Sequence, residues 1–252
     1  MKKKMNGFLL AGVIITAFLT AMILLGAVWT PYDPTAMSGS EKYLSPCLAH
    51  PFGTDNFGRD ILSRVMKGAG TTFSIALLTV AIGAGLGTLI GALTGYFGGI
   101  VDDLLMRLGD ALTAFPSILL ALGLVFIPSF ARVTRTAFAS LRDVNYIKSA
   151  RLMGASSSRI LLVHMLPNTM DVLLPAITIG FNNAVLAEAS MSYLGVGSTP
   201  TDASLGYMLS EAQGMFARAP WYTLCTGLVI VLLVFGVGLI GEGLQRRSGE
   251  VS

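Results

Sequence analysis

Long apolar stretches alternate with short polar segments along the whole chain. Most of these stretches approach the roughly 20 residues that a helix needs to cross the hydrocarbon layer of a membrane. They are Phe8–Thr30, Ala69–Ile100, Ala111–Ala131, Val172–Ala187 and Trp221–Gly241. Because a spanning segment must satisfy its own backbone hydrogen bonds, the pattern predicts an all-α polytopic membrane protein with about five or six membrane helices.

The placement of Lys and Arg predicts which polar segments face the cytoplasm. Three lysines at 2–4 precede an apolar stretch that is too long for a signal peptide, so we expect an uncleaved first helix with a cytoplasmic N-terminus. The segment 31–67 has four acidic and four basic residues and is expected outside. Residues 129–171, with six basic and two acidic residues, and the tail at 246–247 are expected inside. The aromatic pair at 221–222 is predicted to mark the outer interface.

Composition excludes several classes of protein. Hydrophobic residues make up 53% of the chain and charged residues 12%, and the mean hydropathy is +0.70. Soluble domains carry about 25% charged residues. The net charge of +3 gives no support for nucleic-acid binding. The sequence contains no GxxxxGK[ST], HExxH or GxSxG motif, and Cys47 and Cys225 lie far apart, so it predicts no catalytic site, metal site or cofactor in this chain.

Four glycines recur at four-residue spacing in the second apolar stretch. They are Gly83, Gly87, Gly91 and Gly95. This spacing places them on one face of a helix, where the absence of side chains lets a second helix approach closely. The pattern therefore predicts tight helix packing rather than substrate binding.

The basic cytoplasmic segment is predicted to form two short helices joined by a turn. Asp143 is expected to cap the first helix, and Gly154 to end it in a left-handed conformation. Ser156 is expected to help cap a second helix over Arg159–Leu166, which Pro167 interrupts. Such a compact knob suits a cleft in a cytoplasmic partner. The alternative is a solvated basic connector.

The external segment contains a short charged turn. Asp55, Arg59 and Asp60 surround Gly58, which predicts a turn with local ion pairs on the outer face. The alternative is a solvated surface turn without a specific role.

The fourth apolar stretch contains an acidic residue. A charged side chain inside a membrane is costly, so Glu188 marks either a translocation pathway or the outer end of its helix. Asn182 is expected to line the same interior or to bond a neighbouring helix.

Blocks of residues along nearly the whole chain occur in a characteristic order. They are His50–Arg64, Tyr96–Gly99, Ala114–Ser117, the spaced set Ala150, Gly154, His164, Leu166 and Pro167, then Leu186–Ala189 and Ser192–Gly195. Together they resemble the permease subunits of the dipeptide, oligopeptide and nickel family of ABC importers, and in particular its C-type subunit.

The resemblance implies a type I ABC importer transmembrane domain at 69–245, after a first helix and external segment at 1–68. It implies that the loop 131–170 couples to ATPases, and that these partners, rather than this chain, bind ATP and Mg. Further implied partners are a homologous second permease and an external substrate-binding protein. The implied location is a bacterial or archaeal cytoplasmic membrane, with both termini in the cytoplasm.

The resemblance implies import of dipeptides or oligopeptides. Import of nickel or a metal chelate is the alternative within the family. A channel or an intramembrane enzyme is the alternative from another class, and an enzyme would need a pair of facing polar groups inside the membrane.

The residues expected to carry the function fall into four groups. The coupling loop contributes Ala150, Arg151, Gly154, Ala155, His164, Leu166 and Pro167. The external segment contributes Gly53, Thr54, Asp55, Gly58, Arg59 and Asp60. Helix packing uses the four spaced glycines, and Asn182 and Glu188 are candidates for the pathway.

The chain departs from the family pattern in two places. Lys148 and Ser149 stand where the family usually has Glu and Ala. In addition, about one membrane span is missing, because the stretch 111–131 replaces the end of one helix and all of another. With a single crossing there, the coupling loop would lie outside. Either this stretch re-enters and returns to the same side, or the chain is a shortened form of a six-helix parent, which is the interpretation we prefer.

Overall fold

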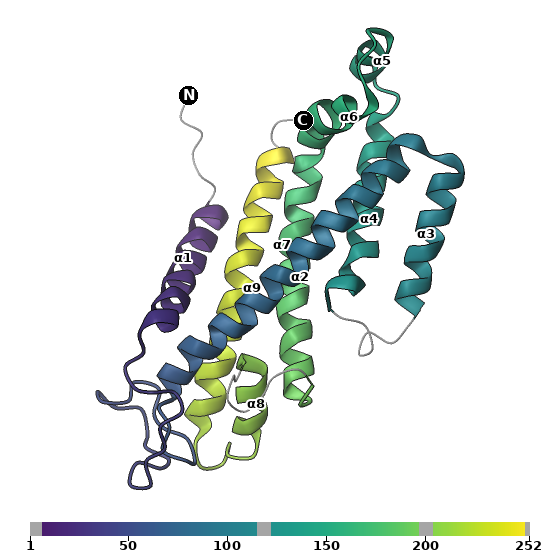
Figure 1. Cartoon of the computed structure of the whole chain (residues 1–252). Coiled ribbons are helices and arrows are strands. Elements are labelled where there is room, and N and C mark those ends of the chain that lie inside the picture. The colour runs from purple at the N-terminus through teal and green to yellow at the C-terminus, as the bar shows by residue number, and fades with distance from the viewer. Residues whose placement is uncertain (1–6, 115–121, 197–203, 250–252) are drawn as a thin grey trace. The chain divides into compact units, whose positions relative to one another are not determined.

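The computed structural model describes residues 7–114, 122–196 and 204–249, which form helices joined by turns (Figure 1). In chain order these are α1 (Gly7–Val28), α2 (Ile61–Phe97), α3 (Gly99–Ala114), α4 (Leu122–Leu141), α5 (Asn145–Leu152), α6 (Ser157–Arg159), the π-helix η2 (Ile160–Met165), α7 (Leu166–Tyr193), α8 (Leu205–Gln213) and α9 (Pro220–Gly249). Apart from one isolated bridge between Thr54 and Asp60, no strand pairing occurs in these residues.

Four helical segments of the described chain are long and apolar enough to cross a membrane. They are Gly7–Val28, Ile61–Phe97, Ser157–Tyr193 and Pro220–Arg246. Apart from the one at 111–131, each apolar stretch predicted from the sequence coincides with one of these segments, although the stretches ending at Thr30 and Ile100 run two or three residues past the end of the helix. The fold class predicted from the sequence is therefore confirmed.

The second spanning helix begins earlier than its apolar pattern predicts. α2 starts at Ile61, and residues 61–68 had been expected to belong to the external segment. Asp60 explains the start, because its carboxylate accepts hydrogen bonds from the backbone N–H (2.8 Å) and the hydroxyl (2.6 Å) of Ser63. This N-cap satisfies a donor that the first turn of a helix leaves free.

The stretch 111–131 does not form one membrane span, which corrects the prediction. α3 ends at Ala114 and α4 begins at Leu122, while residues 115–121 lie outside the described part. The two helices pack side by side and run antiparallel, because Asp102 near the start of α3 pairs with Arg135 in the second half of α4. α4 therefore returns to the side from which α3 departs. This return removes the conflict in the count of crossings.

Pro167 does not interrupt a helix, contrary to the sequence prediction. It is the second residue of α7, and helix continues through it from Ser157 to Tyr193. Pro167 thus lies inside a continuous run of helix, where its ring nitrogen has no N–H to donate. The turn of π-helix just before it, η2, adjusts the hydrogen-bond pattern at this point.

The chain divides into two compact units. The first contains residues 77–181 with the short segments 1–9 and 241–252, and the second contains residues 10–76 and 182–240. The core of the first unit includes Tyr96, Phe138, Ile147, Ala150, Ile160 and Met165. Buried side chains of the second unit include Ile61, Val65, Leu205, Met208 and Tyr222. The coupling loop lies in the first unit and the external segment in the second.

Candidate functional site

The four spaced glycines lie against α4, within the first unit. A Cβ built on Gly87 would come within 2.5 Å of the Phe130 Cβ and 2.7 Å of the Ile127 carbonyl oxygen. Gly83 meets Phe126, Gly91 meets Ala131 and Thr134, and Gly95 meets Arg135 and Phe138. The backbone of α2 thus contacts α4 directly over four consecutive turns, with no room for a methyl group.

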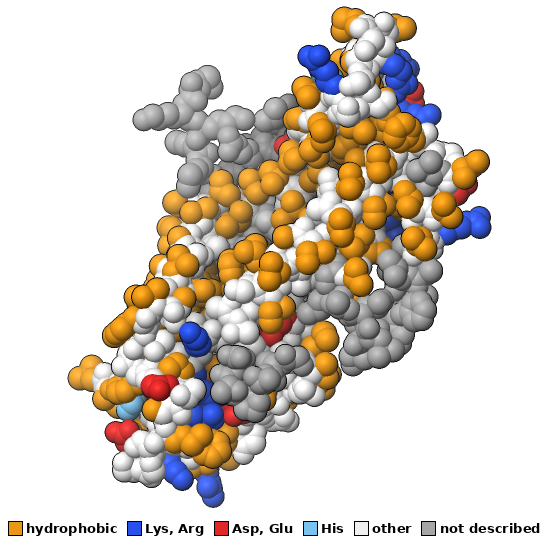
Figure 2. Space-filling model, in the orientation of Figure 1, with side chains coloured by type: hydrophobic (Ala, Val, Ile, Leu, Met, Phe, Trp, Pro, Cys, Tyr) orange, Lys and Arg blue, Asp and Glu red, His pale blue; other side chains and the backbone are white. Residues whose placement is uncertain are grey.

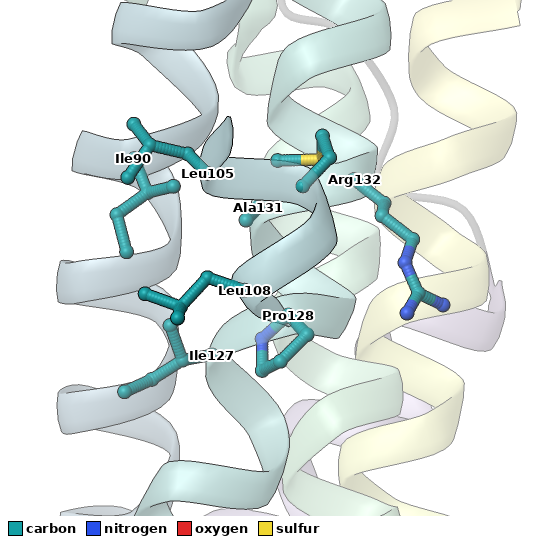
Figure 3. Close-up of a pocket in the computed structure, with 8 residues that line it drawn as sticks. Ile90, Leu105, Leu108, Ile127, Pro128, Ala131 and Arg132 are labelled. Atoms are coloured by element: carbon teal, nitrogen blue, oxygen red, sulfur yellow. The ribbon is translucent and has the colours of Figure 1, made fainter. Parts of the chain in front are cut away.

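A pocket opens between α2, α3 and α4 (Figure 3), with an empty volume of about 380 Å³. Its lining is Ile90, Leu105, Met106, Leu108, Ile127, Pro128, Ala131 and Arg132. Seven of these eight side chains are apolar, so the pocket lacks the converging polar groups that orient a cofactor. Among the residues that the structure describes, no three His, Cys, Asp or Glu side chains gather into a possible metal site.

α5 and the turn after it form a compact knob, residues 141–160. Gly154 follows the helix with φ +84°, as the sequence predicted. Its N–H donates to the Arg151 carbonyl, and the Ala155 N–H donates to the Ala150 carbonyl, both at 3.1 Å. These two bonds make a Schellman turn, which needs a residue with positive φ and brings Ala155 next to Ala150. The spacing of Ala150, Gly154 and Ala155 thus has a local structural cause.

Asp143 does not cap α5, which corrects the prediction. The N-cap position is Val144, whose side chain makes no capping hydrogen bond. Asp143 therefore lies one residue too early to cap, and its carboxylate lies 3.9 Å from the Lys148 ammonium. The second predicted cap is confirmed, because the Ser156 hydroxyl accepts from the Arg159 N–H at 3.4 Å.

The knob is held by its own apolar core. Ile147 and Ala150 on the inner face of α5 pack with Ile160 and Met165 against Tyr96 of α2 and Phe138 of α4. The guanidinium of Arg151 lies 5.3 Å from the centre of the Tyr96 ring. A positively charged side chain over an aromatic ring is held there by a cation–π attraction. The inner face of the knob is therefore fixed to the ends of two long helices.

The outer face of the knob is exposed. Leu152 and Met153 are 89% and 81% exposed, and a Cβ on Gly154 would meet open space. Of the other expected loop residues, Ala155 and Leu166 pack at the edge of the core, His164 is half-buried in η2, and Pro167 is exposed. The His164 carbonyl accepts from the Asn168 amide at 2.6 Å.

The charged turn of the external segment is buried, not solvated. Asp55 is fully buried, and its carboxylate accepts from the backbone N–H groups of Phe57 (2.8 Å) and Arg59 (3.0 Å) and from the Arg59 Nε (2.6 Å). Gly58 closes the turn at φ +76°, where a Cβ would strike Ser38. The predicted local ion pair is present, and the alternative of a solvated turn is wrong.

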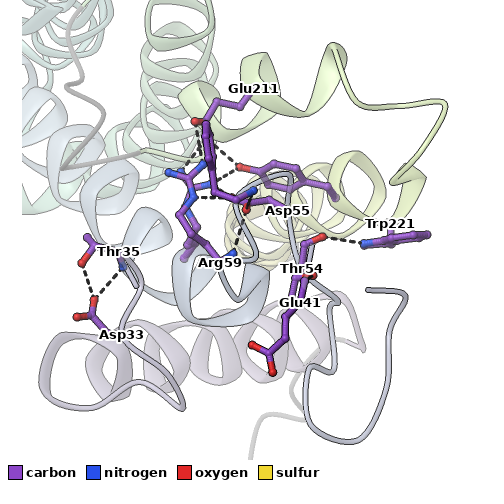
Figure 4. Close-up of polar contacts among 11 residues, drawn as sticks. Asp33, Thr35, Glu41, Thr54, Asp55, Arg59, Glu211 and Trp221 are labelled. Carbon is purple, nitrogen blue, oxygen red and sulfur yellow. Dashed lines mark hydrogen bonds and ion pairs between the residues drawn. The ribbon is translucent and has the colours of Figure 1, made fainter. Parts of the chain in front are cut away.

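Three residues that sequence reasoning missed complete this buried network (Figure 4). Arg64 donates to the Asp55 carboxylate (2.9 Å), the Tyr222 hydroxyl (2.7 Å) and the Glu211 carboxylate (2.7 Å). Glu211 on α8 also accepts from Arg59 (3.2 Å) and from Tyr222 (3.0 Å). Two guanidinium groups thus balance two carboxylates. Tyr222 is fully buried here, and its place at the outer membrane interface stays a prediction.

The other expected residues of the external segment support the network. Asp60 caps α2 and also bonds the His50 Nδ1 at 2.9 Å. The Thr54 hydroxyl accepts from the Leu44 N–H at 2.9 Å. Gly53 takes φ +74°, and a Cβ there would come within 2.5 Å of the Leu44 carbonyl oxygen. The segment is thus tied to its neighbours by buried polar contacts.

The Glu211 carboxylate makes this network sensitive to acid. Burial opposes its ionisation, but attraction and hydrogen bonding from Arg64, and then from Arg59, outweigh burial and hold its pKa below the usual 4.5. Since the pKa is lower in the folded protein, Glu211 stabilises the fold above about pH 4.5, and this stabilisation is lost as the pH falls through the folded pKa.

We therefore expect the melting temperature to fall between about pH 6 and pH 3. Glu211→Gln should lower the melting temperature at the higher pH and reduce the further fall in acid. Asp143→Asn is the matched control, because Asp143 is exposed. Thermal unfolding in detergent across this pH range checks the prediction, and an equal acid response of the Gln variant and the parent would contradict it.

The two pathway candidates, Asn182 and Glu188, both lie on α7, and Glu188 is close to its C-terminal end. Glu188 is 2% exposed, and one of its carboxylate oxygens accepts from the Ser192 hydroxyl at 2.7 Å. The other oxygen is buried and makes no hydrogen bond to the residues that the structure describes. Asn182 is half-buried, and its amide nitrogen would lie 3.2 Å from a Cβ on Gly238 of α9. Glu188 is thus buried and close to the C-terminal end of α7, and its place in a pathway stays a prediction.

The described residues thus contain long apolar helices, a knob with its own apolar core and a buried network of ion pairs. A sequence model of the "binding-protein-dependent transport system inner membrane component" family matches residues 87–249. The chain belongs to this family, and the resemblance seen in the sequence is confirmed.

Curated relatives cover most of the chain. The dipeptide transport system permease protein DppC of Haemophilus influenzae is 33% identical, covering 96% of this chain and 90% of the relative. A putative peptide transport system permease protein of Brucella suis is 38% identical, covering 90% and 83%. The glutathione transport system permease protein GsiD of Escherichia coli is 37% identical, covering 90% and 81%.

A solved structure shares the fold. A chain of the methionine ABC transporter MetNI, in an inward-facing conformation, matches with a TM-score of 0.59 at 19% identity, over 74% of this chain and 95% of that chain. The chain therefore has the fold of a type I ABC importer transmembrane domain. It is a multi-pass inner-membrane permease component without catalytic activity, and it works with ATPase subunits and a substrate-binding protein.

Proposed function

We propose that the chain is one of two homologous permease subunits that together move small peptides into the cell. Two cytoplasmic ATPases drive the movement, and an external binding protein delivers the peptide. The names of the relatives support this cargo, because dipeptide, peptide and glutathione permeases match most of the chain. These names favour peptides over nickel or a metal chelate.

The knob is the observation that carries the proposal. A surface that transmits force from an ATPase must be exposed on one side and firmly attached on the other. The knob meets both requirements, because Leu152 and Met153 are exposed while Ile147 and Ala150 are locked into a core with α2 and α4. In this proposal, closure of the ATPases on ATP displaces the knob, and the attached helices open the pathway alternately to each side.

In this arrangement the N-terminus, the knob and the C-terminus face the cytoplasm. The excess of basic residues in these segments supports that orientation. The external segment and its buried network then lie where the binding protein docks, and Asn182 and Glu188 lie beside the peptide pathway.

The α3–α4 hairpin is proposed to be a shortened form of the family's hairpin. α3 has 16 residues and is therefore about 24 Å long, less than the roughly 30 Å of a hydrocarbon layer. The alignment with the Haemophilus influenzae relative also extends over 265 positions, more than the 252 residues of this chain. The relative thus has residues that this chain lacks.

Replacing Gly154 tests the docking role. Gly154→Arg is expected to abolish co-purification of the ATPases, because it strains a residue at φ +84° and places a long side chain on the exposed tip. Gly195→Arg is the matched control, since Gly195 also has positive φ (+80°) and open space around its Cβ position. Membrane insertion should be normal for both variants. Unchanged co-purification of the Gly154 variant would remove the docking role.

A further inference from the structure

Lys148 presents a positive charge on the outer face of α5. Its neighbours Ile147 and Ala150 are buried, whereas Lys148 itself is exposed. The nearest carboxylate, that of Asp143, lies 3.9 Å from the ammonium, and these side chains are 81% and 54% exposed respectively. An ion pair this long and this exposed is weak in water. The charge of Lys148 is therefore available to a partner.

The residues around Lys148 are also mostly positively charged. Residues 141–160 contain four exposed basic residues, Arg142, Lys148, Arg151 and Arg159, and a single acidic residue, Asp143. The knob therefore carries a net charge of +3. In Figure 2, blue basic side chains flank the end of the molecule where α5 and α6 lie, and orange side chains cap it.

The exposed tip of the knob, formed by Leu152 and Met153, is apolar. Leu152 and Met153 are almost fully exposed to water beside this basic rim. Large apolar side chains at the centre of a charged rim form the usual anatomy of a protein interface. A partner that fits this surface has an apolar pocket for the tip and acidic side chains around it.

We propose that the ATPase groove that receives this knob is acidic opposite Lys148, so that the permease and its ATPase form a charge-matched pair. The inference rests on the docking role of the knob proposed above. Lys148 therefore selects the ATPase, while Leu152 and Met153 supply apolar contact.

Binding of the ATPase to the assembled permease pair in nanodiscs tests the inference. Lys148→Glu is expected to weaken binding about tenfold or more at low ionic strength, with Lys148→Gln intermediate. The difference should shrink at high salt, because salt screens exposed charges. Lys42→Glu, an exposed lysine in the external segment, is the control and should bind like the parent. Equal or tighter binding of the Lys148→Glu variant would overturn the inference.

A second variant and a change of lipid distinguish failure of the charge matching from failure of the docking role. Leu152→Asp reports on docking itself, so loss of binding with this variant but not with Lys148→Glu would leave the docking role intact and remove only the charge matching. If Leu152→Asp also binds normally, the proposed docking fails. If the effect of Lys148→Glu appears only in nanodiscs with anionic lipid, Lys148 acts on the lipid surface, and the inference is overturned.

Discussion

Arg64→Met is expected to lower the free energy of unfolding by about 3–5 kcal/mol. The Arg64 side chain is 3% exposed and donates to two carboxylates and a phenol. Without it, Asp55 and Glu211 keep their negative charges in a buried site with only Arg59 to balance them. A buried charge that loses its partner is far more costly than an exposed one.

Lys67→Met is the matched control for this prediction. Lys67 lies three residues further along α2 and is exposed, so the same change of side chain should have little effect. Thermal unfolding and the yield of monodisperse protein in detergent measure both variants. Equal stability of the two variants would show that the buried network contributes nothing to the fold. Arg64→Lys should be intermediate, since it keeps the charge but cannot reach three acceptors with the same geometry.

Gly87→Leu is expected to separate α2 from α4. The new side chain would begin 2.5 Å from the Phe130 Cβ and 2.7 Å from the Ile127 carbonyl, so one helix must move. Overpacking of this kind typically costs about 1–3 kcal/mol, and contact with backbone atoms leaves little room for relief. The melting temperature should fall, and ATPase coupling should weaken because the core of the knob includes the end of α4.

Gly85→Leu provides the control on the same helix. A Cβ at Gly85 meets nothing within 4 Å, so this variant should be as stable as the parent or more so, because leucine favours helix over glycine. Comparison of the two melting temperatures isolates the contact with α4 from the change in helix propensity. A similar effect of both substitutions would argue against a tight α2–α4 contact.

The apolar pattern predicted the long helices but not all of their ends. Length and hydrophobicity located α1, α2 and α9 because those properties are local. The start of α2 was missed because Arg64 and Lys67 made its first turns look like loop, whereas the Asp60 cap sets the boundary. α3 was missed for a similar reason, since Asp102, Asp103 and Arg107 interrupt its apolar residues. A period of four in Ile100, Leu104 and Leu108 is the signal that would have revealed it.

The two candidate sites differed in how far the sequence revealed them. The knob follows from short-range rules, because the Schellman turn needs only the local spacing of Ala150, Gly154 and Ala155. The external network could not be assembled in this way. Glu211 and Arg64 are 147 residues apart, and no periodicity links them. Only burial of both in one fold brings their charges together, and the apolar pattern does not reveal that the Tyr222 hydroxyl bonds to both.

The glycine contact between α2 and α4 has a mechanical consequence. Where side chains separate two helices, a push on one is partly absorbed as rotamers change and the helices slide. Along Gly83, Gly87, Gly91 and Gly95 the two backbones touch, so such slack is minimal. A displacement applied at the end of α4 would therefore travel along both helices as along one stiff rod. A methyl group added at any of these glycines would separate the two backbones and let α2 and α4 move relative to each other.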